Sequence, residues 1–64
     1  MSYREAKELA LLRQTLRDCL TALDPQRAHA ALARLADLAR AGTDAELSAE
    51  ADRWAFRFGL LAAA

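Results

Sequence analysis

The chain of 64 residues contains no valine, isoleucine or asparagine, and this absence bears directly on its fold. Valine and isoleucine are among the residues from which β-sheets are built, so the chain has almost no material for one. Its most frequent residues, alanine and leucine, are instead among the strongest helix formers. The sequence therefore predicts an all-α protein, and at this length a single domain over residues 1–64.

Cysteine and histidine occur once each, which limits both stabilisation and chemistry. Cys19 cannot close a disulfide within the chain, and Cys19 with His29 cannot complete a His/Cys metal site. A hydrophobic core of this size contributes about 3–5 kcal/mol, so domains this small often recruit a partner. We therefore expect no metal or cofactor, and we expect self-association or a protein partner to supply the missing stabilisation.

Neither sign of charge is in excess, because nine Lys and Arg residues balance nine Asp and Glu residues. Binding to nucleic acid or to anionic membranes ordinarily requires a surplus of cations. No apolar run approaches the ~20 residues that cross a bilayer. The charged opening, residues 1–5, lacks the apolar segment of a secretory signal. We expect a cytoplasmic protein of bacterial type, without a membrane span, for which nucleic acid is not the favoured partner.

The single proline and the two glycines divide the chain into three helical segments. We expect helices over about 3–23, 25–41 and 44–58, joined by connections of two or three residues. Connections this short place successive helices antiparallel to each other. The sequence thus predicts a small three-helix bundle of antiparallel neighbours that self-associates.

Polar and conformationally special residues mark the ends of these helices. Asp24 is expected to cap the second helix, with Pro25 at its first position. Gly42 suits the left-handed position just past a helix end. The third helix is expected to open with a capping box formed by Thr43 and Glu46.

Apolar residues recur at spacings of three and four, which gives each helix one apolar face. The predicted core comprises Leu9, Leu12, Leu16, Leu20 and Leu23 on the first helix, Leu32, Leu35 and Leu38 on the second, and Leu47, Ala51, Trp54 and Phe58 on the third. The inward positions of the second helix also include small alanines, which let its neighbours approach closely. Trp54 and Phe58 are expected to fill the remaining space.

Several apolar residues lie outside these core faces, and a chain of this size has no fourth element to cover them. Phe56 lies opposite Trp54 on the third helix, and Leu11 lies opposite the leucine face of the first. We expect the outer face of the third helix to dock on a protein partner or on a second copy, as a homodimer. The residues predicted to bind the partner are Phe56, Leu60, Leu61, Arg53, Arg57 and Leu11, with the two arginines setting the register.

A simpler interpretation of the same residues stays open. Single exposed leucines are ordinary on protein surfaces. The segment 60–64 can also fold back and cover Phe56. In that case the protein is a small helical bundle without a docking face.

Catalysis is not expected. A Cys/His nucleophile needs a base in hydrogen-bond reach and a third group to orient it, and the chain has no set of residues for this. It also lacks a glycine-rich phosphate loop and a Gly-x-Ser-x-Gly turn. We therefore predict a non-catalytic adaptor, inhibitor or co-chaperone without a small-molecule substrate.

Two alternative functions remain. Arg13 and Arg17 lie one turn apart on the first helix, a pattern that favours either a solvated face or RNA binding by a dimeric helical hairpin. In length and helical build the chain resembles small plasmid proteins that modulate antisense-RNA pairing. The segment from Leu12 to Gln26 is also similar to the short helical hairpins that act as co-chaperones of needle subunits in type III secretion, although a third helix exceeds such a hairpin. That resemblance implies a helical-repeat partner.

Overall fold

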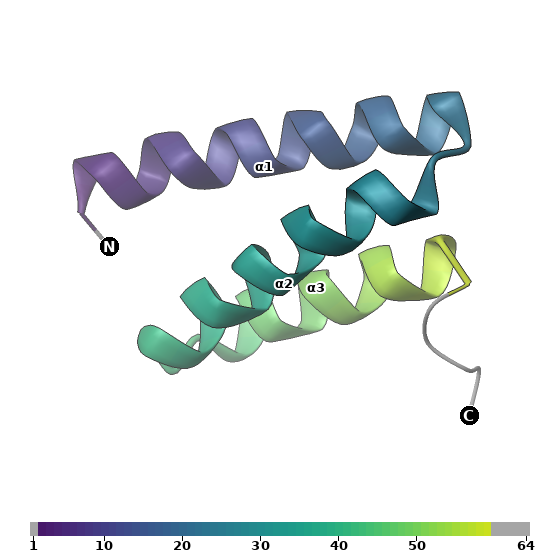
Figure 1. Ribbon diagram of the computed structural model, residues 1–64. Helices are drawn as coiled ribbons and strands as arrows, with labels where there is room; N and C mark the ends of the chain where they lie inside the picture. Colours follow the sequence, from purple (N-terminus) through teal and green to yellow (C-terminus); the bar gives the residue numbers. More distant parts are fainter. Residues whose placement is uncertain (1, 60–64) are drawn as a thin grey trace.

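A computed structural model describes residues 2–59, and it consists of three α-helices that run up, down and up (Figure 1). The helices are α1 (Tyr3–Ala22), α2 (Pro25–Ala41) and α3 (Ala45–Arg57). The predicted all-α fold with antiparallel neighbours is confirmed, and each helix boundary lies within one residue of its expected place. Both α1 and α3 pack on α2, so α2 is the central helix of the bundle.

The hydrophobic core is centred on α2, which contributes two residues without exposed surface, Ala28 and Leu35. Small alanines on its inner faces let both neighbours approach, and leucines from α1 together with Leu47 and Trp54 from α3 fill the layers between the helices. The buried residues are Leu9, Leu16, Cys19, Ala28, Ala31, Leu32, Leu35, Leu38, Ala39, Leu47, Ala51 and Trp54. Leu12, Leu20 and Phe58 are partly buried and pack against this cluster. The thiol of Cys19 is fully buried.

The core prediction is wrong for Leu23, whose side chain is 83% exposed. Leu23 adopts a left-handed conformation with φ of 56°, and it lies just past the end of α1. The reversal of the backbone lets the N–H of Asp24 donate to the carbonyl of Cys19 at 2.9 Å. Leaving the helical path at this point turns the Leu23 side chain away from the leucine face that its spacing predicts.

The second turn also differs from its prediction, because Gly42 is not left-handed. Gly42 has φ of −92°, and Thr43 takes the left-handed conformation with φ of 47°. The predicted capping box of Thr43 and Glu46 is therefore wrong as well. Asp44 caps α3 instead, and its carboxylate accepts the backbone N–H of Leu47 at 3.0 Å.

The two turns share one design. In each, a left-handed residue precedes an aspartate whose N–H donates back to the helix just ended, as Asp44 does to Ala39 at 3.0 Å. The same aspartate then accepts an N–H from the first turn of the next helix, as Asp24 does from Arg27 at 3.1 Å. One residue thus satisfies free backbone groups of two successive helices, which explains how such short connections are closed.

Candidate interaction surface

A groove runs between α1 and α3, where the two helices lie side by side without the close packing that each makes with α2. Its volume is about 290 Å³, and its lining residues are Arg13, Arg17, Glu50, Arg53, Trp54 and Arg57. The residues of each helix lie one turn apart, and because α1 and α3 run in the same direction their carboxyl-terminal halves meet here. The structure therefore gathers four of the nine basic residues around one tryptophan and one glutamate.

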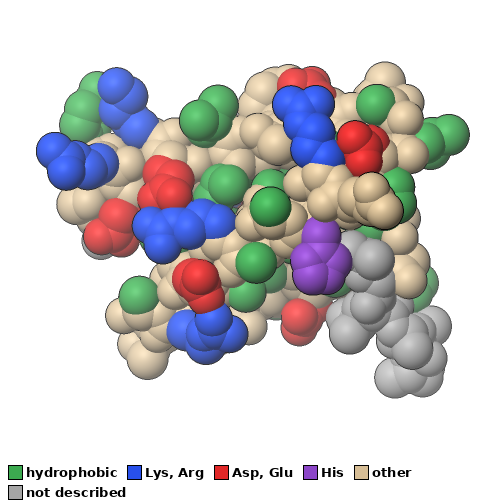
Figure 2. Space-filling view, viewed as in Figure 1, with side chains coloured by type: hydrophobic (Ala, Val, Ile, Leu, Met, Phe, Trp, Pro, Cys, Tyr) green, Lys and Arg blue, Asp and Glu red, His purple; other side chains and the backbone are tan. Residues whose placement is uncertain are grey.

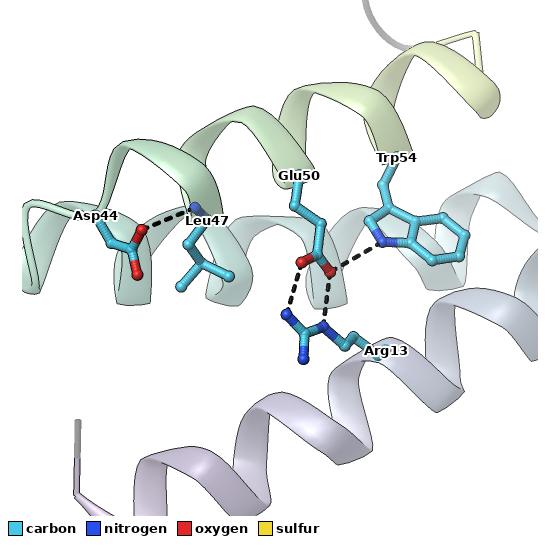
Figure 3. A network of polar contacts seen from close by, with 5 residues as sticks. All are labelled: Arg13, Asp44, Leu47, Glu50 and Trp54. Atoms are coloured by element: carbon cyan, nitrogen blue, oxygen red, sulfur yellow. Dashed lines mark hydrogen bonds and ion pairs between the residues drawn. The ribbon is translucent and has the colours of Figure 1, made fainter.

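Arg13 and Glu50 form the ion pair that ties α1 to α3 across this groove (Figure 3). The guanidinium of Arg13 donates twice to the carboxylate, at 2.8 and 2.7 Å, and the indole N–H of Trp54 donates to the same carboxylate at 3.4 Å. These hydrogen bonds hold the pKa of Glu50 below its usual value and raise the pKa of Arg13. Arg13, one of the two arginines considered for RNA binding, is thus already paired within the protein.

The other three arginines of the groove have no carboxylate partner among residues 2–59. The guanidinium of Arg57 lies over the Trp54 ring, 5.0 Å from its centroid, and makes a cation–π contact with it. Arg17 donates to the side-chain oxygen of Gln14 at 2.9 Å. Arg53 is exposed at the outer edge of the groove. The groove consequently carries three uncompensated positive charges.

A second, apolar pocket adjoins the groove on the other side of Arg57. Its volume is about 200 Å³, and apart from Arg57 it is lined by Leu20, Leu23, Pro25 and Phe58. Leu23, which the turn expels from the core, therefore becomes part of a pocket wall. Phe58 is held there by stacking on Trp54, with ring centroids 6.4 Å apart.

The outer faces of α1 and α3 carry the exposed apolar residues that the sequence places there. Phe56 is 55% exposed and Leu11 is 66% exposed. Neither side chain lines the groove or the apolar pocket. Leu60 and Leu61, the other predicted apolar anchors, lie outside the described residues.

Sequence reasoning identified the arginines of both helices but assigned them to two different hypotheses. Arg13 and Arg17 belonged to an RNA-binding face and Arg53 and Arg57 to the edge of a docking face. Their common groove, its glutamate and the apolar pocket beside it were missed. The spacing of Glu50, Arg53 and Arg57 along one edge of α3 was the available signal, since residues three and four apart share a helix face.

Comparisons of the chain with protein families, with curated proteins and with solved structures give no match. Within residues 2–59, no helix is long and apolar enough to cross a membrane. The same residues contain no group of three or more potential metal ligands. On the face of the molecule drawn in Figure 2, positive and negative side chains lie interspersed, in contrast to the arginine-lined groove.

Proposed function

We propose that this protein is a non-catalytic helical interaction module that docks through the outer face of α3 and forms a homodimer there. The observation that carries the proposal is the exposed ring of Phe56, opposite the buried face of the helix. An aromatic side chain exposed on a helix of so small a protein is a typical anchor of a protein interface.

The residues around Phe56 favour a second copy as the occupant, because they complement themselves. Phe56 and the small Ala49, two turns before it, are both exposed on the outer side of α3, with Asp52 on the edge toward α2 and Arg53 on the edge toward α1. In an antiparallel pair of α3 helices centred on Asp52 and Arg53, each Phe56 faces the small Ala49 of the other copy. A two-fold interface permits this arrangement, because the same large and small residues then meet at both ends of the contact.

The test is the mass of the protein in solution, measured by sedimentation velocity at micromolar concentrations. The unmodified chain should sediment as a dimer, and Phe56→Asp should sediment as a monomer with unchanged helical circular dichroism. Leu11→Asp, the matched change on the outer side of α1, should remain dimeric. A monomeric unmodified chain, or equal loss of the dimer in both variants, would contradict the proposal.

A further inference from the structure

We propose that the groove between α1 and α3 binds an acidic segment of a partner protein, with an apolar side chain of that segment seated in the adjoining pocket. This site is distinct from the outer face of α3 and does not depend on dimerisation. Its central residues are Arg17 and Arg57, with Leu23 in the wall of the apolar pocket.

The charge of the groove argues for carboxylates as the ligand groups. One of its arginines, Arg13, already donates two hydrogen bonds to the Glu50 carboxylate, with 2.7 Å between the closest atoms. This internal pair is the geometry that a guanidinium and a carboxylate prefer. Arg17 and Arg57 line the same groove without a carboxylate partner among residues 2–59, and each can donate hydrogen bonds to a ligand carboxylate in the same way.

The groove is also prepared for binding before a ligand arrives. The Arg57 guanidinium lies over Trp54, between the basic groove and the apolar pocket, so part of its side-chain freedom is already lost before Arg57 pairs with a ligand. The indole N–H of Trp54 in turn donates a hydrogen bond to the carboxylate of Glu50. A ligand therefore meets the Arg57 guanidinium between the basic groove and the apolar pocket.

The apolar pocket determines which class of acidic ligand fits. Among residues 2–59, Arg57 is the only polar residue that lines it, and the other four are Leu20, Leu23, Pro25 and Phe58. A leucine or phenylalanine next to a carboxylate can fill this pocket while the carboxylate pairs with Arg57. The exposure of Leu23, held out of the core by a left-handed turn, supplies the outer wall.

A nucleic acid suits the site less well than an acidic peptide. Along the edge of α3, Glu50 and Glu46 follow the arginines at one-turn intervals toward the amino terminus of the helix, so a continuous phosphate backbone would meet Glu50, already paired with Arg13, and then the anionic Glu46. The protein as a whole also has no surplus of positive charge to attract a polyanion. The positive region is short, as a few peptide carboxylates require.

The experiment is a titration of the full chain followed by fluorescence of Trp54, its only tryptophan. The probe is a short synthetic peptide in which pairs of glutamates alternate with pairs of leucines. The fluorescence should change to saturation, and affinity should fall as salt is raised because exposed charges are screened. The same peptide with glutamine in place of glutamate should give no saturable change.

Protein variants locate the binding. Arg17→Glu should weaken binding about tenfold, while Arg4→Glu, the same change at the far end of α1, should alter it less than about twofold. Leu23→Ser should weaken binding about fivefold through the apolar pocket. Phe56→Asp should bind the peptide like the unmodified chain, which separates this site from the dimer interface.

Three results would overturn the inference. The first is the absence of a saturable change with the acidic peptide. The second is equal weakening by Arg17→Glu and Arg4→Glu, which would indicate only nonspecific charge attraction. The third is tighter binding of a uridine oligonucleotide of the same net charge, which would assign the groove to RNA.

Discussion

Single residues in left-handed conformations end α1 and α2, and the amino acids found there are unexpected. Leu23 and Thr43 adopt positive φ angles of 56° and 47°, whereas Gly42, next to the second of them, does not. A leucine and a β-branched threonine are both unfavourable in this region, where glycine is the default. The glycine of the second turn therefore occupies a position that does not need it.

Gly42→Ala should accordingly stabilise the protein. The φ and ψ of Gly42, −92° and −1°, are accessible to alanine, and an added Cβ would lie 3.6 Å from the carbonyl oxygen of Leu38, an ordinary contact. Alanine reduces the freedom of the unfolded chain, so the free energy of unfolding should rise by about 0.4–1 kcal/mol. Urea denaturation followed by circular dichroism measures this.

The control for this prediction is the other glycine. Gly59 has φ of +71°, so alanine is strained there even though no other part of residues 2–59 comes within 4 Å of the added Cβ. Gly59→Ala should therefore give no stabilisation. Equal stabilisation by both changes would mean that the left-handed conformation is not what distinguishes the two positions.

At the scale of the elements, the helices themselves follow from local sequence, and the turns between them do not. The leucines of α1 recur at helical spacing, and Pro25 fixes the start of α2, so fold class and boundaries were predictable. The left-handed residue of each turn is instead set by the bond that the following aspartate donates back to the preceding helix. The sequence does not reveal this hydrogen bond, and for this reason the spacing of the leucines wrongly predicted Leu23 to lie in the core.

Asp44 provides the test of this turn design. Because its carboxylate accepts the N–H of Leu47 in the first turn of α3, Asp44→Ala should lower the free energy of unfolding by about 1 kcal/mol. Thermal or urea denaturation gives the value. Thr43→Ala should change stability far less, since the threonine hydroxyl donates only to the carbonyl of Gly42. A larger loss of unfolding free energy from Thr43→Ala than from Asp44→Ala would instead support the capping box of Thr43 and Glu46 that the sequence predicts.

On the scale of the whole molecule, the site depends on how α1 and α3 are aligned. Arg13, Arg17, Arg53 and Arg57 are visible in the sequence, but their meeting depends on the register in which both helices pack on α2. That register is a product of the whole core and cannot be derived from the spacing within either helix. The sequence therefore could not predict the groove itself, although it could predict the basic edge of each helix.

The Arg13–Glu50 pair makes the alignment of α1 and α3 sensitive to acid. Hydrogen bonds from Arg13 hold the pKa of Glu50 below the ordinary value of 4.5, so in acid the unfolded chain binds a proton before the folded protein does. The stabilisation by this pair is thus fully present above that ordinary value and is lost as the pH falls through the lower pKa of the folded state. Arg34 lowers the pKa of Glu8 in the same direction, between α1 and α2.

Glu50→Gln should therefore flatten the dependence of stability on pH. At neutral pH the variant should lose about 0.5–1 kcal/mol, a modest figure because the Arg13 side chain is 41% exposed and its charge is partly screened. Urea denaturation between neutral pH and about pH 3 should show the curves of variant and unmodified chain converging in acid, since both then lack the Glu50 charge. Glu8→Gln should retain the part of the pH dependence that belongs to Glu50. If Glu50→Gln instead loses stability as steeply on acidification as the unmodified chain, the ion pair does not hold α1 against α3, and the arginine groove is free to open in solution.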